Sequence, residues 1–573
     1  MNQRIDTIAV DDGGNRQARE AMHRRVSWPL NLTPSSVGYV SEGHALILGN
    51  ERDARRAARA LHDRGLASVT LLLTEPVDPS AGDAAGAGDD TLLAETRTLA
   101  CHTLTREQAR NLRIDGYLGR FRVTLGQGDQ ALDLGRALLE RDHFDQILDL
   151  GEAPALALEL PPPGYVTTRW GAAECDSRLE AFAALVGEFD KPRYFQINHD
   201  LCAHAASGNT GCTRCLEVCP ADAIQSRQSR VESRIEIDPY RCHGVGSCSS
   251  ACPTGAIEFR LPETLRQQET LVAWLAAYRQ AGGTLPVVRF GAAEHLRDEG
   301  EPAGHVLDVP LEELGAAGHD QWLTALAAGA AEVRLQYHPD MPERLVAFID
   351  DQLAQAHALL EALGHPPERI SVLAVGDTAA RDALPRHPPL AADGLVLDGT
   401  GKRERLDRVL DHLAGQGHPN GERHAMPADA AYGGIAVDTQ RCTLCMACVA
   451  GCPTPALAAG EERPELSFRE ADCVQCGLCV EACPEEAIAL LSGFLADPAR
   501  GQRRVCHEEA AFECIRCGKP FATASTIATI KARLADHPYF AGDAMSRLEM
   551  CEDCRVRDVW RELARDPESQ LKV

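Results

Sequence analysis

The sequence predicts a mixed fold, α/β plus α+β, in which two α/β domains alternate with two cysteine-rich domains. Three observations support this fold class. Predicted strands alternate with amphipathic helices in two separate stretches, a pattern typical of parallel sheets covered by helices. Most of the 22 cysteines gather in two compact segments, one after each stretch. A smaller cysteine set near the end of the chain indicates a C-terminal metal-knuckle region.

The domain boundaries follow these changes of pattern along 573 residues, a length that suggests about four domains. We expect a flexible N-terminal tail (1–35), a first α/β domain (36–190), a first cysteine-rich domain (191–262), a second α/β domain (263–414), a linker (415–435), a second cysteine-rich domain (436–491) and a helical region with a metal knuckle (492–573).

Composition and charge narrow the function classes. The net charge of −26 argues against nucleic acid, whose phosphates would repel the protein. It suits docking to a basic face on a partner, and general surface acidity for solubility is the alternative. The cysteine spacing in a long chain indicates metal binding in a reducing compartment rather than disulfides. The chain has neither an apolar N-terminal segment nor an apolar run of about 20 residues that would span a bilayer. We therefore expect a cytoplasmic protein without a transmembrane segment.

The first α/β domain is predicted from short apolar strands and one strongly amphipathic helix, 51–64, whose Ala54, Ala57, Ala58 and Leu61 form one stripe. The other predicted elements are strands 37–40, 45–48, 68–73 and 144–150, helices 132–139 and 178–189, and a loop at 78–90. The turn after Leu48 lacks the glycine fingerprint of dinucleotide-binding folds. This favours a structural scaffold over a flavin or NAD(P) site.

The second cysteine-rich domain carries the pattern Cys-x2-Cys-x2-Cys-x3-Cys-Pro twice in full. The two runs are Cys442, Cys445, Cys448, Cys452 and Pro453, then Cys473, Cys476, Cys479, Cys483 and Pro484. Thiolates are soft ligands that suit iron–sulfur clusters, and in this pattern the fourth cysteine ligates the other cluster. One 4Fe-4S cluster would take Cys442, Cys445, Cys448 and Cys483, and the other Cys473, Cys476, Cys479 and Cys452. Zinc knuckles or disulfides are the alternative.

This segment resembles bacterial-type two-cluster ferredoxins at every ligand position, so a ferredoxin-like dicluster fold is expected there. The first cysteine-rich domain follows the same plan irregularly. Its first run, Cys202, Cys212, Cys215 and Cys219, has nine residues between its first two cysteines instead of two. In its second run, Cys242, Cys248 and Cys252, Val245 stands where a cysteine belongs.

The crossing rule then gives two unequal sites in the first cysteine-rich domain. A 4Fe-4S cluster would take Cys202, Cys212, Cys215 and Cys252 if the inserted loop closes back. The other site has only Cys242, Cys248 and Cys219, because valine cannot ligate iron. It would hold a 3Fe-4S cluster, as in ferredoxins that lack this cysteine, or a 4Fe-4S cluster with an external ligand such as His243, or no cluster.

The second α/β domain is predicted from strands 286–290, 305–309, 332–336 and 370–375 and helices 263–279, 321–328 and 341–363. Both α/β domains are expected to contain a Rossmann-like parallel sheet. After residue 491, two Cys-x2-Cys hooks, Cys514 with Cys517 and Cys551 with Cys554, predict one zinc site, with iron or free thiols as alternatives. Helices are expected at 525–534 and 546–550. The isolated Cys101 and Cys175 are interpreted as buried small hydrophobic residues.

These features predict an iron–sulfur electron-transfer protein with three or four clusters that relays electrons between redox protein partners. The cluster segments resemble polyferredoxins and the electron-transfer subunits of oxidoreductases. No phosphate loop, nucleophile elbow or paired-histidine zinc helix occurs in the sequence, so a stand-alone enzyme is not favoured. Two alternatives remain open. One is an oxidoreductase that binds flavin or NAD(P) on an α/β domain. The other is an iron–sulfur sensor or scaffold.

Overall fold

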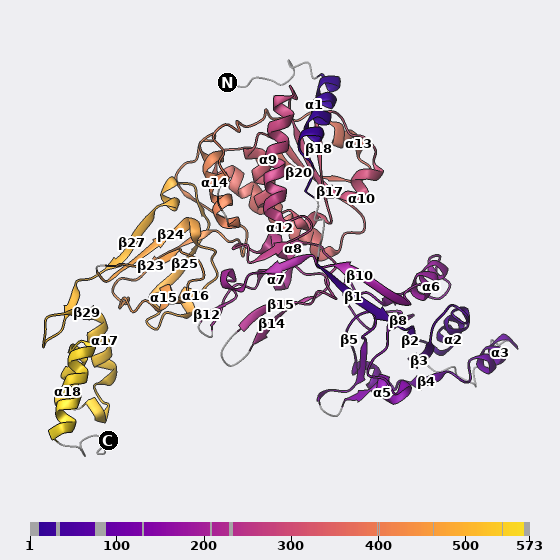
Figure 1. Ribbon diagram of the computed structural model, residues 1–573, viewed down its shortest axis with the longest axis horizontal. Coiled ribbons are helices and arrows are strands. Elements are labelled where there is room, and N and C mark those ends of the chain that lie inside the picture. Colours follow the sequence, from indigo (N-terminus) through magenta and orange to yellow (C-terminus); the bar gives the residue numbers. More distant parts are fainter. Residues whose placement is uncertain are drawn as a thin grey trace.

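The computed structural model describes residues 11–29, 35–74, 87–128, 131–206, 209–228, 233–397, 399, 401–461, 463–540 and 542–565. The chain forms two α/β units, two small cysteine-rich units between and beside them, and a C-terminal unit of helices and a hairpin (Figure 1). The described residues contain no helix that is both long enough and apolar enough to cross a membrane.

The first α/β domain is built on a five-stranded sheet in the order β4-β3-β2-β8-β9, and every pairing is parallel. Its strands are β2 (His44–Gly49), β3 (Ser68–Leu73), β4 (Ala100–Thr103), β8 (Gln146–Asp149) and β9 (Tyr165–Thr167). Alternate residues of β2 point to opposite faces, as strand geometry requires. Ile47 belongs to the core under the helices, and Leu46 belongs to the core on the other face.

One face of this sheet is covered by helices α2 (Glu51–Ala60) and α6 (Cys175–Ala183). The predicted alanine stripe of α2 is buried there, and Asn50 caps the helix by accepting from the backbone N–H of Asp53. The other face is covered by α5 (Leu134–Leu139) and an antiparallel meander of β5 (Leu112–Asp115), β6 (Arg122–Leu125) and β7 (Leu132–Asp133). A separate ribbon pairs β1 (Ser36–Ser41) with β10 (Gly187–Pro192).

Three details of the predicted secondary structure in this domain are wrong. The helix expected at 178–189 ends at Ala183, and the chain from Gly187 forms β10, which pairs with β1. The helix expected at 132–139 begins two residues later, because Leu132 and Asp133 form β7 and Asp133 caps α5. Residues 87–90 of the expected loop belong to α3 (Ala87–Glu95), and residues 78–86 lie outside the described residues.

The second α/β domain contains a four-stranded parallel sheet in the order β18-β17-β19-β20. The strands are β17 (Val287–Ala292), β18 (Val306–Leu311), β19 (Glu332–Tyr337) and β20 (Ile370–Ala374). The helices are α9 (Thr264–Gln280), α10 (Ala293–Asp298), α11 (His319–Ala327), α12 (Glu343–Ala362), α13 (Thr378–Asp382) and α14 (Lys402–Ala414). Trp322, Leu335 and Leu359 lie in its core, the largest hydrophobic cluster among the described residues.

The prediction of a flexible N-terminal tail is wrong for the described part of that segment. Residues Asp12–Arg25 form helix α1, which packs against α9 of the second α/β domain (Figure 1). Met22 is fully buried in that core, and Trp274 donates its indole N–H to the carbonyl of Val26. The polar pattern hid this contact because only Ala18 and Met22 are apolar on the buried side.

The two cysteine-rich domains share one plan, in which an outer strand pair and an inner hairpin enclose two short helices. The first has β11 (Phe195–Ile197) with β16 (Ile257–Phe259), β14 (Ile224–Gln228) with β15 (Ser233–Ile237), and helices α7 (Arg214–Glu217) and α8 (Ser247–Ala251). The second has β22 (Gly433–Val437) with β25 (Ile488–Ser492), β23 (Leu457–Ala459) with β24 (Glu465–Arg469), and helices α15 (Ala447–Ala450) and α16 (Leu478–Glu481). All these strand pairs are antiparallel.

The segments that flank the second cysteine-rich domain are packed against their neighbours. In the expected linker, β21 (Arg423–His424) pairs with β26 (Phe494–Leu495), and Tyr432 is buried. β27 (Arg503–Glu508) joins β24. The hairpin of β28 (Ala511–Glu513) and β29 (Pro520–Thr523) leads to α17 (Ala524–Leu534) and α18 (Glu552–Arg565), drawn in yellow in Figure 1. The helix expected at 546–550 is part of a 3₁₀ segment, Gly542–Glu549.

Candidate iron–sulfur and metal centres

Three cysteine loops share one unusual backbone conformation. In the two complete runs, the residues on either side of the second cysteine have positive φ: 54° and 62° at Leu444 and Met446, and 52° and 82° at Gln475 and Gly477. The incomplete run repeats this at Gly244 and Gly246, with 79° and 82°, on either side of Val245. Non-glycine residues rarely adopt this region, so the loop is shaped to wrap closely around a bound group. The Val245 loop therefore keeps the cluster-binding shape without the cysteine.

In two of the four runs, the fourth cysteine begins a turn that directs a backbone N–H group toward its sulfur. The N–H of Ala223 lies 3.4 Å from the sulfur of Cys219, and the N–H of Ala487 lies 3.3 Å from that of Cys483. Both turns contain a residue with positive φ, Asp222 or Glu486. Hydrogen bonds to the ligating sulfur stabilise its negative charge.

The cysteines of the second domain form two groups, each completed by the fourth cysteine of the other run. Burial raises the pKa of Cys448 to about 12, helped by its neighbours Cys442, Cys445 and Cys483. We name the group of Cys442, Cys445, Cys448 and Cys483 centre D. Burial likewise raises the pKa of Cys479 to about 12, helped by Cys473, Cys476 and Cys452, which with it form centre C. Thiols that are neutral when buried release protons when they bind metal.

The inserted loop of the first domain closes back on itself. Strands β12 (Ala205–Ala206) and β13 (Asn209–Thr210) form a small hairpin, and the N–H of Cys212 donates to the carbonyl of Ala203 at 2.9 Å. The buried His204 stabilises the hairpin, because its two ring nitrogens bond the carbonyl of Cys212 and the hydroxyl of Ser226. Burial raises the pKa of Cys215, and the charges of its three neighbours Cys252, Cys212 and Cys202 raise it further. These four cysteines are centre B.

Centre A has three cysteines, Cys219, Cys242 and Cys248. Burial raises the pKa of Cys248 well above its usual value, and the charges of Cys242 and Cys219 add to this effect. Val245 packs against the core of the second α/β domain. The neighbouring His243 has its Nε2 2.9 Å from the carbonyl of Pro161 in the first α/β domain, which leaves only Nδ1 for any other partner.

Centres B and C lie next to each other, although they belong to different domains. The charge of Cys212 contributes to the raised pKa of Cys476, after burial, Cys452 and Cys473. A side chain at Gly211 would meet Leu478 at 2.7 Å, so α16 packs directly on the hairpin of the first domain (Figure 1). Arg214 joins the two, since its guanidinium lies 3.4 Å from the sulfur of Cys212 and donates to the carbonyl of Val474.

Comparison with known families decides the nature of these segments. A protein family described as the 4Fe-4S dicluster domain matches this chain twice, at residues 210–256 and at residues 441–487.

The chain contains two 4Fe-4S dicluster domains. Both matched spans carry the cysteine runs described above, and Cys202 lies just before the first span. These domains support an iron–sulfur electron-transfer role. Among curated proteins, none matches this chain.

Two cations at the start of α14 contact both dicluster domains, and they were missed from the sequence. Lys402 donates to the carbonyls of Ser249 and Ser250 in the first dicluster domain. Arg403 donates to the carbonyls of Ala471 and Cys473 in the second. The only sign of their role in the sequence is that Lys402 and Arg403 are adjacent basic residues near the predicted end of the second α/β domain. Their charges lie where thiolate-bound clusters would add negative charge, which lowers the cost of placing clusters there.

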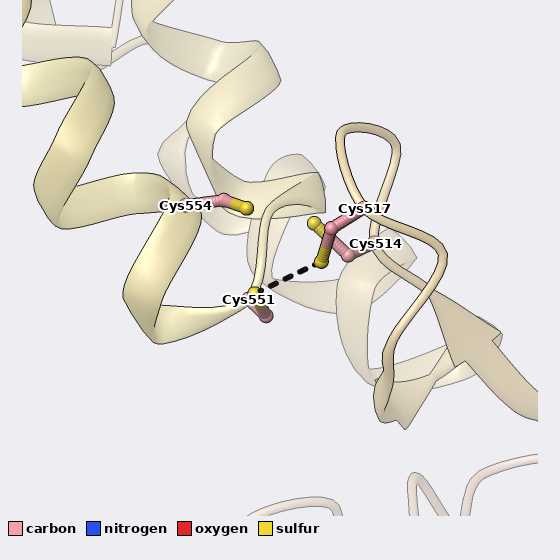
Figure 2. A group of neighbouring side chains, drawn as sticks. All are labelled: Cys514, Cys517, Cys551 and Cys554. Atoms are coloured by element: carbon pink, nitrogen blue, oxygen red, sulfur yellow. Dashed lines mark hydrogen bonds between the residues drawn. The ribbon is translucent and has the colours of Figure 1, made fainter.

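The four cysteines of the C-terminal knuckle converge from two elements (Figure 2). Cys514 and Cys517 lie in the turn between β28 and β29, and Cys551 and Cys554 lie at the start of α18. Their sulfur atoms are within 4.8 Å of one another, with Cys517 and Cys551 3.6 Å apart. Burial opposes ionisation of Cys514, but the backbone N–H groups of Cys551, Arg516 and Cys517 lower its pKa to about 6. Four thiol groups at this spacing fit a tetrahedral zinc ion.

The isolated cysteines differ from each other. Cys175 is buried under the first sheet, as expected. The expectation that Cys101 is buried is wrong, because it lies on β4, the edge strand of that sheet, and is exposed.

Proposed function

We propose that this protein relays electrons between redox partners through four centres arranged in the order A, B, C and D. Iron–sulfur clusters would supply reversible one-electron chemistry at each centre. The observation that carries the proposal is the proximity of Cys212 and Cys476, which joins the two dicluster domains. Within the domains, Cys248 neighbours Cys215 and Cys479 neighbours Cys448, so the row is continuous.

We propose for the relay the ligand sets that the spacing predicts. Centres B, C and D would each hold a 4Fe-4S cluster with four thiolates. Centre A would hold a 3Fe-4S cluster, or a 4Fe-4S cluster with an external ligand. The negative charge of the bound clusters would be stabilised by the N–H groups of Ala223 and Ala487 and by Arg214. Burial of the cysteines would exclude water from the clusters.

The exchange of electrons with a partner is proposed to occur at centre D. Cys445 is exposed there, whereas every other cysteine of the four centres is buried or half-buried. The exposed carboxylate of Glu486 lies in the same domain and adds to the strongly negative net charge of the chain. These features favour a redox protein with a basic docking face as the partner. We place this exchange in the cytoplasm as part of the proposal.

The alternative in which an α/β domain binds flavin or NAD(P) has one observation in its favour. In chain order, the strands of the first sheet follow the arrangement 3-2-1-4-5, which is part of the Rossmann order. A ligand would then enter between β2 and β8. Asp149 at that point already accepts from Tyr165, Gly151 and Ala155, so its oxygens are occupied. We therefore interpret the domain as a scaffold.

The proposal is tested by a reductive titration of anaerobically purified protein with dithionite, followed by an acceptor such as cytochrome c. A relay takes up several electrons per chain reversibly and passes them on over repeated cycles. Loss of iron in each cycle would instead indicate a sensor. A flavin released by acid precipitation would favour the enzyme alternative.

A further inference from the structure

Two histidines and a carboxylate lie together in the second α/β domain, apart from the cysteine centres. His295 lies in α10, His338 directly follows β19, and Asp340 lies two residues further on. Their possible ligand atoms are within 4.8 Å of one another. The rings of His295 and His338 are stacked, with centroids 4.3 Å apart and an interplanar angle of 29°.

This cluster lies where an open parallel sheet ordinarily binds a ligand. The chain passes from β17 to its neighbour β18 on one side, and then returns to place β19 on the other side of β17. Ligands bind in the crevice at such a switch point, at the carboxyl ends of the strands. His295 follows the end of β17, and His338 follows the end of β19.

One nitrogen of each histidine ring lacks a hydrogen-bond partner among the described residues. His338 is only 9% exposed, and its Nε2 lies 3.0 Å from the carboxylate of Glu313. Because a carboxylate accepts, Nε2 carries the hydrogen, and in the neutral ring Nδ1 then holds a lone pair. Nδ1 of His338 and Nε2 of His295 are both buried and without a hydrogen-bond partner among the described residues. A carboxylate behind an imidazole is the usual support of a metal-ligating histidine.

We propose that His295, His338 and Asp340 bind a divalent transition-metal ion of the Zn²⁺ or Fe²⁺ class, with Glu313 orienting His338. Two imidazoles and one carboxylate suit these ions better than Ca²⁺ or Mg²⁺, which prefer oxygen ligands. Three protein ligands leave a position for water or a substrate atom, as in catalytic rather than structural zinc sites. The Glu294 carboxylate, 3.7 Å from Nε2 of His295, adds negative charge nearby.

The proposed site borders the incomplete cluster loop. Glu313 accepts from the N–H of Leu314, at the start of a 3₁₀ turn, Leu314–Ala316. That turn packs on the loop so closely that a side chain at Gly246 would meet Ala316 at 2.5 Å. The metal proposal itself does not depend on the relay, because it uses none of the cysteines.

The test measures metal content. Anaerobic holo-protein is incubated with Zn²⁺, and separately with Fe²⁺, then desalted and analysed for zinc, iron and sulfide. His338→Ala and Asp340→Asn should each bind about one metal ion less per chain than wild type, with sulfide unchanged. His62→Ala, which changes an exposed histidine, should match wild type. Equal metal content in wild type and both site variants would overturn the proposal.

A second variant and a spectrum protect the test against misfolding. Glu313→Gln keeps all three ligands and should weaken zinc binding about 10–100-fold. Zinc X-ray absorption in a Cys514→Ala/Cys517→Ala background should show imidazole scattering that His338→Ala removes. Wild-type affinity in Glu313→Gln together with a spectrum free of imidazole would also overturn the proposal.

Discussion

At the scale of single residues, Val245 is the most informative position in the chain. Its flanking glycines keep the backbone conformation of the complete cluster loops, so the loop retains its shape while one ligand is missing. The side chain instead packs on the core of the second α/β domain. The sequence identified the missing ligand from spacing. It could not reveal that the loop keeps the same backbone, because φ depends on the packing of Ala316 against Gly246.

Val245→Cys should convert a 3Fe-4S cluster at centre A into a 4Fe-4S cluster, because it restores the fourth thiolate in a loop that already has the right shape. Iron should rise by about one atom per chain, and the EPR signal of the oxidised protein should disappear. Val372→Cys is the matched control, since this exposed valine on β20 should leave both quantities unchanged. An unchanged oxidised signal in Val245→Cys would contradict the assignment.

Arg214 is the residue that joins the two dicluster domains. It donates to the carbonyls of Asp429, Ala430 and Val474, which all lie beyond its own domain. Arg214→Ala should weaken the contact by about 1–3 kcal/mol, because charged hydrogen bonds are lost at a partly buried site. Hydrogen exchange at residues 428–434 and 474–478 should become faster.

Arg227→Ala is the control for this effect. Arg227 is exposed and pairs with Glu236 on a neighbouring strand of its own hairpin, so its loss should leave exchange at the contact unchanged. Equal protection in Arg214→Ala and wild type would mean that the packing of Leu478 alone holds the domains together.

At the scale of elements, the regular strands and amphipathic helices could be predicted, and the elements defined by distant partners could not. The stripe of α2, strands β2, β3 and β8 of the first sheet and the four strands of the second sheet follow directly from local pattern, whereas the edge strands β4 and β9 were not predicted. In contrast, α1 is polar over most of its surface, and it is placed by its packing on α9 and by hydrogen bonds such as that of Arg19 to the carbonyl of Ala303. Residues 187–189, the first half of β10, were interpreted as helix. The pairing of this strand with β1, which is far away in sequence, overrides the local propensity.

The C-terminal knuckle is an element whose stability should depend on metal. Cys514→Ala should release about one zinc ion per chain and leave iron constant, because the four sulfurs belong to one site separate from the clusters. The hydrophobic cluster of the knuckle is small, with Met550 buried beside Cys514 and Cys551 and Phe521 packed against them. Without metal, α18 should therefore become more accessible to proteases. Cys175→Ala, which changes a buried cysteine outside every centre, is the control.

Loss of iron instead of zinc in Cys514→Ala would contradict the zinc assignment and indicate an additional iron site. The knuckle also contacts centre D, since Thr523 and Thr526 donate to the carbonyl of Thr443 beside Cys442. Removal of zinc should therefore make centre D more sensitive to air, which iron analysis after timed exposure would detect.

At the scale of the whole molecule, the two α/β domains and α14 hold the dicluster domains in one arrangement. Cysteine spacing alone predicts a ligand set for each centre, because each run is local and the crossing rule is general. Spacing carried no information about the neighbours Cys212 and Cys476, because they are brought together by packing between domains. His295 and His338 escaped notice for the same reason, since they meet only when β17 and β19 pair.

EPR of two double variants after reduction tests whether the four centres form a continuous row. Cys242→Ser/Cys442→Ser should disable centres A and D and leave B and C, one in each domain. Cys215→Ser/Cys476→Ser should leave A and D. If the row is continuous, the two remaining clusters should show a spin–spin interaction in the first variant and independent signals in the second. Independent signals in the first variant, at the iron content expected for two clusters, would contradict a continuous row.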